Sequence, residues 1–146
     1  MKALEKANVE YIGCWPVDPN EARQAKRLIH ITPAEHLHLI HGNDQHILVS
    51  LIVSNEYVTL GLITIPPGGY SGIEDHEGEE ALEVLQGTLV VRTFKPGEEF
   101  DLEKASHMSL TVRRGEKLYL PLGVKHCYKN FGDDVVRAYF AVAPRL

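Results

Sequence analysis

The 146-residue sequence is poor in cysteine, tryptophan and methionine, and it contains no long apolar run. Its two cysteines, Cys14 and Cys127, have no CxxC spacing and belong to no disulfide-rich pattern, which excludes a disulfide-stapled secreted scaffold. No stretch approaches the roughly 20 apolar residues that a membrane span needs. The N-terminus, MKALEKANVEYIG, lacks the apolar core of a signal peptide. We therefore expect a cytoplasmic protein without a membrane partner.

Basic charge is also scarce, because 15 Lys and Arg residues stand against 20 Asp and Glu residues, for a formal net charge of −5. A nucleic-acid-binding protein usually carries a basic patch, and none is visible here, so we expect no nucleic-acid partner. Hydrophobic residues make up 44% and charged residues 24%, as in a typical globular protein. The length predicts a single domain over residues 1–146. Histidine is abundant, with eight copies, and its imidazole serves in proton transfer and metal ligation.

The pattern divides the chain into an N-terminal extension, residues 1–55, and a β-rich body, residues 56–146. In the extension, Asp18-Pro19-Asn20-Glu21 has the form of a helix start, and apolar residues at helical spacing predict one short helix over 18–29. Strands are predicted at 36–41 and 46–54, with a turn cluster between them.

The body predicts more short strands separated by turn residues. They fall at 57–65, along the apolar stretch 81–93, and at 108–113, 117–120 and 135–142. The polar stretch 94–107 is interpreted as an excursion between two strands. Many short strands spaced roughly 8–12 residues apart indicate an all-β sandwich or barrel.

Two motifs that combine turn residues with potential metal ligands lie within the body. They are Gly68-x5-Glu74-x-His76-x3-Glu80-x6-Gly87 and Gly115-x5-Pro121-x-Gly123-x2-His126-x3-Asn130. Together they resemble the two signatures of the cupin family, G-x5-H-x-H-x3,4-E-x6-G and G-x5-P-x-G-x2-H-x3-N. The second motif matches at every fixed position, and the first departs only at Glu74, where the family has a histidine. The resemblance covers about residues 66–130 and implies a single double-stranded β-helix, or jelly-roll barrel.

The spacing of the candidate ligands favours a single metal site. Glu74 and His76 are two residues apart, so on an extended segment both side chains point to one face. Glu80 begins a strand four residues beyond His76, and His126 comes from a different strand pair. Two histidines with two carboxylates form a harder, more anionic ligand set than three histidines with one carboxylate. One divalent ion is therefore predicted, with Mn²⁺ or Fe²⁺ preferred and Zn²⁺ or Ni²⁺ left open.

Glu74 leaves alternatives open. Its carboxylate reaches about as far as an imidazole and could be a fourth ligand. Otherwise the metal is held by His76, Glu80 and His126 alone, a two-histidine, one-carboxylate set typical of non-haem Fe²⁺ sites, and Glu74 could act as a base. In a third alternative the metal is lost and these groups line a pocket.

Tyr128 is two residues beyond His126, so it should face the same interior, where its phenol could position substrate or move a proton.

Three functional classes compete. The cupin resemblance implies isomerases, epimerases and lyases, in which a metal acts as a Lewis acid on a small polar carbonyl compound. Such a compound would be a sugar, a sugar acid, or a keto or hydroxy acid. The resemblance also implies Fe(II)-dependent dioxygenases, and the third class binds a small ligand without turnover. The redox-neutral isomerase or lyase is the preferred prediction, with Glu74 and Tyr128 as catalytic residues.

The remaining histidines and the extension bear on assembly. His36, His38, His41 and His46 have no fixed common register, so a solvated or dimer-facing strand is preferred to a second metal site. His107 could overhang the pocket mouth. A small jelly roll leaves sheet edges, and the extension is longer than one barrel needs, which together predict a homodimer.

Overall fold

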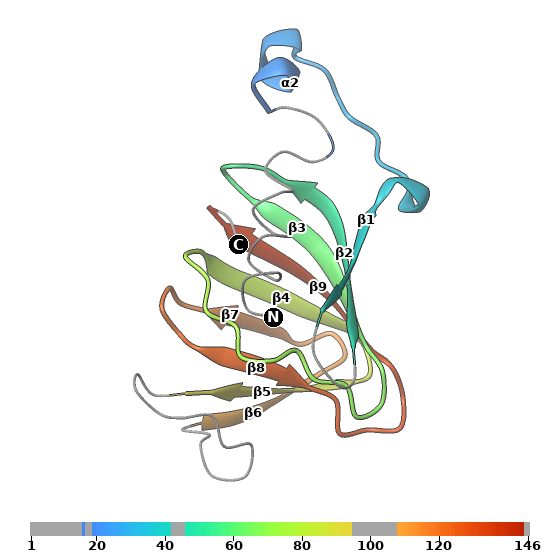
Figure 1. Ribbon diagram of the computed structural model, residues 1–146, viewed down its shortest axis with the longest axis vertical. Helices are drawn as coiled ribbons and strands as arrows, with labels where there is room; N and C mark the ends of the chain where they lie inside the picture. Colours follow the sequence, from blue (N-terminus) through green and yellow to red (C-terminus); the bar gives the residue numbers. More distant parts are fainter. Residues whose placement is uncertain (1–15, 17–18, 42–45, 95–107, 145–146) are drawn as a thin grey trace.

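The computed structural model describes residues 16, 19–41, 46–94 and 108–144, and these form mainly antiparallel β-structure (Figure 1). The elements in chain order are α2 (Pro19–Ala25), the 3₁₀ turn η1 (Pro33–Glu35), β1 (Leu37–His41), β2 (Ile47–Ser54), β3 (Thr59–Ile65), β4 (Glu79–Gln86), β5 (Thr88–Thr93), β6 (Met108–Arg113), β7 (Lys117–Leu120), β8 (His126–Lys129) and β9 (Val136–Ala143). The all-β class expected from the sequence is confirmed. Within the described ranges, no helix is long and apolar enough to cross a membrane.

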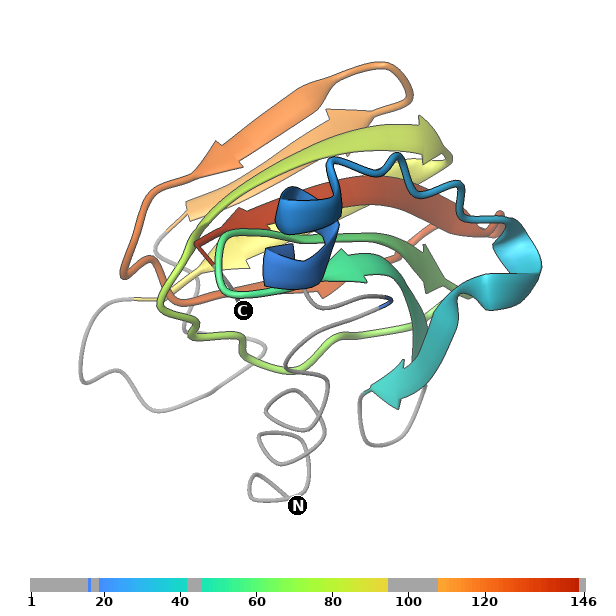
Figure 2. The same cartoon turned by 90° about the horizontal axis from the view of Figure 1, so that it is seen from above.

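The strands form two antiparallel sheets. The larger has the order β1-β2-β3-β9-β4-β7, and the smaller has the order β6-β5-β8. Figure 2 shows the larger sheet running from β1 at one edge to β7 at the other. The added strands of the N-terminal extension, β1 and β2, therefore continue the barrel sheet at its edge.

Alternation of apolar and more polar residues along the strands builds the core between the sheets. In β3, alternate residues from Thr59 to Ile65 are buried, and β9 shows the same period. The inward residues of both sheets meet in one apolar cluster, which includes Leu51, Ile63, Leu82, Val84, Leu89, Val91, Tyr128, Phe140 and Val142. Glu80 and His126 are buried on the same inward faces, so the barrel interior holds both the core and the polar cluster.

Two expectations about local structure are wrong in detail. The apolar stretch 81–93 is not one strand: the chain turns at Gly87, whose φ is 76°, and β4 and β5 then belong to different sheets. The helix is also shorter than the predicted 18–29. It ends at Ala25 because Lys26 adopts a left-handed φ of 48°, and Leu28, one of the apolar residues at helical spacing, is 97% exposed. The predicted cap, Asp18, lies outside the described residues.

The connection between β3 and β4, residues 66–78, runs antiparallel beside β8. Isolated bridges join Tyr70 to Lys129 and Glu74 to His126. Glu74 and His126 exchange both backbone hydrogen bonds, at 2.7 and 3.1 Å. This pairing places the first motif beside the second, although they are far apart in the sequence.

Candidate metal centre

Four side chains predicted from the motifs converge at one end of the barrel. Glu74 and His76 come from the connection 66–78, Glu80 from β4 and His126 from the first position of β8. One ligand atom from each residue can be chosen so that all four lie within 4.8 Å of one another. Glu80 and His126 are buried, with 2% and 0% exposure, whereas Glu74 and His76 are partly accessible.

The distances separate a tight trio from an outlying carboxylate. Glu80 Oε2 lies 3.0 Å from His76 Nε2 and 3.5 Å from His126 Nε2. The nearest oxygen of Glu74 is 3.9 Å from His126 Nε2. Ligands that surround one ion at about 2.1 Å are roughly 3.0–3.4 Å apart when they are neighbours. The contacts of Glu80 with His76 and His126 are close to this spacing, and Glu74 stands at the margin of the cluster, farther from His126.

Backbone carbonyls orient both imidazoles. His76 Nδ1 lies 2.8 Å from the carbonyl oxygen of Gly78, and His126 Nδ1 lies 2.9 Å from that of Val124. A carbonyl oxygen can only accept, so each Nδ1 carries a proton, which leaves each Nε2 facing Glu80 Oε2. His76 Nε2 is within hydrogen-bond distance of that oxygen, at 3.0 Å. Among the described residues, the buried His126 Nε2 has no hydrogen-bond partner. Two imidazole nitrogens around one carboxylate oxygen need positive charge between them, and with neutral rings a divalent metal ion would supply it, so this donor set fits such an ion.

Tyr128 fixes the carboxylate of Glu80 from behind. Its buried hydroxyl donates a 2.7 Å hydrogen bond to Oε1, which leaves Oε2 directed at the imidazoles. Burial raises the pKa of Glu80, but the interactions with His126, His76 and Tyr128 outweigh it and lower that pKa to about 2. Glu80 is therefore ionised in the site.

Glu74 has a different electrostatic environment. Burial raises its pKa, as does the charge of Glu80, while the charges of His126 and His41 act against this rise. Its side chain is 19% exposed, against 2% for Glu80. Glu74 is thus the more basic and the more accessible of the two carboxylates.

The other candidates lie in distinct places. Asp75 faces away from the cluster, and its carboxylate pairs with Lys125 at 3.3 Å. His38 is exposed and contacts the Ser50 hydroxyl at 2.9 Å. His107 lies outside the described residues.

One residue near the site was missed by the sequence analysis. His41 is half-buried at the end of β1, and its charge lowers the pKa of Glu74. The available signal was its parity, because His41 shares a strand face with Leu37 and Leu39, which pack on the core.

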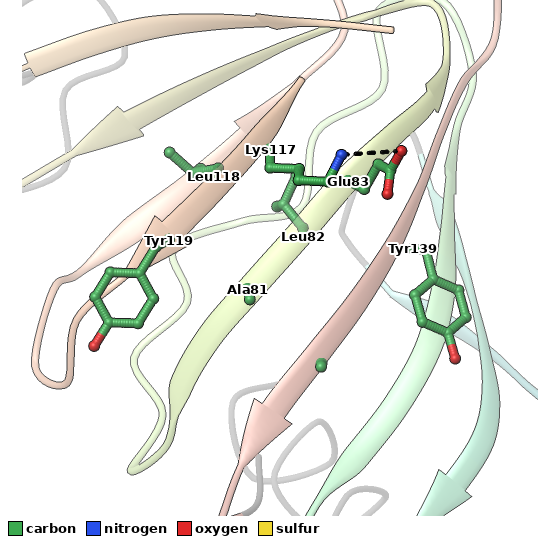
Figure 3. Close-up of a pocket in the computed structure, with 8 residues that line it drawn as sticks. Ala81, Leu82, Glu83, Lys117, Leu118, Tyr119 and Tyr139 are labelled. Atoms are coloured by element: carbon green, nitrogen blue, oxygen red, sulfur yellow. Dashed lines mark ion pairs between the residues drawn. The ribbon is translucent and has the colours of Figure 1, made fainter. Parts of the chain in front are cut away.

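A separate hollow of about 430 Å³ lies on the outer face of the larger sheet (Figure 3). Ala81, Tyr119 and Tyr139 line it, and Lys117 Nζ pairs there with Glu83 at 3.4 Å. Along β4, Ala81 and Glu83 alternate with the inward Glu80 and Leu82, so the hollow and the metal centre are on opposite faces of the sheet.

Comparison with protein families agrees with this geometry. The model of the cupin domain family matches residues 61–142, which is more than half of the chain and includes the four clustered residues. The protein therefore belongs to the cupin family, as the two motifs predict. No curated protein matches the sequence.

Solved structures share the fold at low sequence identity. A predicted oxalate decarboxylase from Thermotoga maritima has a TM-score of 0.63 and 17% identity, with 80% of this chain and 99% of that chain covered. The cupin domain of Cnp3 from Schizosaccharomyces pombe has a TM-score of 0.59 and 17% identity, covering 81% and 70%. An RmlC-like cupin from Shewanella frigidimarina has a TM-score of 0.59 and 13% identity, covering 80% and 92%. These similarities confirm the jelly-roll fold.

Proposed function

We propose that this protein is a metal-dependent enzyme that carries out a redox-neutral isomerisation, epimerisation or lyase reaction on a small polar carbonyl compound. The observation that carries the proposal is the donor set, in which two imidazole Nε2 atoms lie within 3.5 Å of one oxygen of an ionised Glu80. His76, Glu80 and His126 would hold the ion, with Mn²⁺ or Fe²⁺ preferred. A divalent ion there supplies Lewis-acid polarisation of a substrate oxygen.

Glu74 is the proposed base. Its raised pKa makes it a better proton acceptor than an ordinary glutamate, and its margin position leaves it accessible to substrate. The proton on the carbon next to the substrate carbonyl would move to Glu74, and its return to the same or a neighbouring carbon would complete an epimerisation or an isomerisation. The sequence leaves open whether Tyr128 positions substrate or moves a proton. Its hydrogen bond to Glu80 favours a role in positioning that carboxylate.

A second candidate function is an Fe(II)-dependent dioxygenase. The specific observation in its favour is that His76, Glu80 and His126 form the tight trio, whereas Glu74 lies 3.9 Å from the nearest imidazole nitrogen. Such a two-histidine, one-carboxylate set leaves coordination positions open.

The first experiment combines metal analysis with proton exchange. Untagged protein is analysed for bound metal, loaded with Mn²⁺ or Fe²⁺, and incubated in D₂O with sugars, sugar acids and keto or hydroxy acids. We expect deuterium to enter next to the carbonyl, without any need for O₂. Protein that cannot be loaded with Mn²⁺, Fe²⁺, Ni²⁺ or Zn²⁺ would contradict both enzyme functions. Activity that disappears without O₂ and returns with it would favour the dioxygenase.

A matched pair of variants tests the base. Glu74→Gln keeps the size of the side chain and removes the proton acceptor, so we expect metal to be retained and deuterium exchange to be lost. Asp75→Asn makes the same change at the neighbouring exposed carboxylate and should leave exchange intact. Loss of metal in Glu74→Gln would instead make Glu74 a ligand.

We also propose that the protein is a homodimer. The outer face of the larger sheet supports this, since Ile40, Leu48, Tyr119 and Tyr139 are all exposed there and β1 is the edge strand among the residues that the structure describes. Light scattering should give twice the 16.4 kDa chain mass. A monomer mass would contradict the proposal.

A further inference from the structure

We infer that the ligand of the metal centre carries an apolar substituent, which lies against Met108 and Leu110 of β6 while its oxygen donors face the clustered glutamates and histidines. This inference rests on the proposed function and narrows its substrate class. It selects keto or hydroxy acids with an aliphatic side chain over sugars and sugar acids.

The register of the smaller sheet places these two residues beside the cluster. Thr93 pairs with His126 on one side and with Met108 on the other. Directly paired residues project to the same face of a sheet, so Met108 shares the inner face with His126. One step deeper, Val91 pairs with both Tyr128 and Leu110. The apolar pair is thus aligned with the metal ligand and with the tyrosine behind Glu80.

Their exposure shows that this inner surface is open. Val112, the next residue on the same face of β6, is 3% exposed, whereas Leu110 is 44% and Met108 is 58% exposed. Single exposed apolar residues are common on protein surfaces. Here two successive inward positions are exposed, and exposure increases toward the end of the strand that lies level with His126. They form an apolar shelf at the mouth of the barrel.

The dimensions fit one small ligand. Neighbouring strands lie about 4.8 Å apart, so Met108 is roughly 10 Å across the sheet from His126. A compound held at the cluster by a carbonyl and an adjacent carboxylate would reach the shelf with a short aliphatic chain. A polyhydroxylated chain would place its hydroxyls against a thioether and a leucine side chain, where they lose hydrogen bonds to water.

The shelf also disfavours a charged group at the far end of the ligand. A second carboxylate there would lie against the thioether of Met108 and the side chain of Leu110, where it would lose hydrogen bonds to water. The favoured ligand is therefore a monocarboxylate.

The test uses Mn²⁺-loaded protein and a series of 2-keto acids. Mn²⁺ uptake is measured first, and then pyruvate, 2-oxobutanoate, 2-oxopentanoate and 2-oxohexanoate are titrated by calorimetry. We expect each added methylene to tighten binding about three- to fourfold. 2-Oxoglutarate, which ends in a second carboxylate, should bind more weakly than 2-oxohexanoate.

Variants locate the effect on the shelf. In the double variant Met108→Gln and Leu110→Asn, the dependence on chain length should disappear while pyruvate affinity stays within about twofold of the parent protein. Leu85→Asn is the matched control, because Leu85 is also 44% exposed but lies on the outer side of β4. Met108→Gln alone, at the most exposed position, serves if the double variant does not fold.

The outcomes separate the two proposals. Mn²⁺ uptake with affinities that do not change along the series, or with the same chain-length dependence in the shelf variants, overturns this inference alone. Tighter binding of sugars than of 2-oxohexanoate overturns it as well. Protein that takes up no metal contradicts the proposed function, and this inference fails with it.

Discussion

The hydroxyl of Tyr128 shows how much of the site depends on groups that would not touch a substrate. It donates to Glu80 Oε1 from a fully buried position. The backbone nitrogen of Tyr128 also donates a hydrogen bond, 2.9 Å long, to the hydroxyl of Ser71. The carboxylate of Glu80 is thereby held with its other oxygen between two imidazoles. Groups that orient a ligand in this way typically affect metal affinity strongly.

Tyr128→Phe should weaken metal binding about 10- to 100-fold while leaving the fold intact, because the ring stays and only the hydrogen bond to Glu80 is lost. The measurement is a competition titration with Mn²⁺ or Zn²⁺. Tyr139→Phe is the control, since Tyr139 lies on the outer face of β9. Equal affinity in the two variants would show that His76 and His126 alone orient the carboxylate.

Asn130, the last residue of the second motif, acts on stability. Its amide nitrogen donates to the carbonyl oxygens of Ile65 and Asp134, at 3.0 and 2.8 Å, and its oxygen accepts from Gly132 N at 2.9 Å. Asn130→Asp removes both donations and places a carboxylate beside two carbonyls in a buried position. We expect the free energy of unfolding to fall by about 3 kcal/mol or more in urea denaturation.

Asn55→Asp is the matched control for that substitution. Asn55 Oδ1 accepts hydrogen bonds from the backbone nitrogens of Tyr57 and Val58, at 2.9 and 3.2 Å, and aspartate can accept both. Its stability should change by no more than about 0.5 kcal/mol. If the two variants were equally stable, the buried amide of Asn130 would not be needed.

For individual residues, the sequence predicted which side chains form the candidate metal centre but not the distances between them. Spacing along the chain gave Glu74 and His76 a common face, and the structure brings both to the cluster. Spacing contains no information on the 3.9 Å gap that sets Glu74 apart, because that gap depends on the path of the connection beside β8. His41 was missed for a similar reason, since β1 reaches the site only through tertiary structure.

The glycines of the two motifs affect how the strands are connected. Those at positions 68, 87, 115 and 123 all have positive φ, between 74° and 83°. Gly87 turns the chain from β4 in one sheet to β5 in the other, and Gly123 lies in the turn that leads into β8. The family pattern thus conveys backbone conformation as well as metal ligands.

Gly87→Ala should destabilise the protein more than Gly123→Ala. Both add a side chain in the left-handed region, which costs about 1–2 kcal/mol. At position 87 the new Cβ would also lie 2.8 Å from the carbonyl oxygen of Val135, whereas at position 123 nothing lies within 4 Å. The comparison is of unfolding free energies in urea, and equal losses would mean that the backbone near Val135 yields at little cost.

Strand positions were predictable because period-two patterns and turn residues are local. The strands at 108–113 and 117–120 match the sequence prediction at both ends. The division at Gly87 was not predicted, because apolar residues continue on both sides of it and only the glycine marks the change of sheet. The helix was predicted too long because helical spacing does not show whether Leu28 has a surface to pack against.

For the whole molecule, the paired motifs allowed the jelly-roll fold to be predicted, and the family match confirms it. The sequence could not reveal the shelf at Met108 and Leu110, because it requires both the strand pairing across β5 and the exposure of one sheet edge. A surface built from three paired strands that are far apart in the sequence cannot be predicted from any one segment alone.

A divalent ion should raise the melting temperature of the whole domain. A free ion concentration of 100 times the dissociation constant stabilises the folded state by about 2.7 kcal/mol. For a domain of this size that corresponds to roughly 5–10 °C, measured by calorimetry with and without Mn²⁺ or Zn²⁺. His126→Asn should lose the shift, while His38→Asn, at an exposed histidine, should keep it. A shift retained in His126→Asn would place the ion elsewhere.

The reciprocal backbone bonds between Glu74 and His126 have a consequence for the rates of folding and unfolding. The four potential ligands come from two segments that meet only when the connection 66–78 has docked beside β8. Contacts between such distant segments form late in folding, because the entropy of closing a long loop is lost before the contacts can stabilise the chain. A bound ion would therefore leave the refolding rate nearly unchanged and slow unfolding, so its contribution would be to the lifetime of the native barrel.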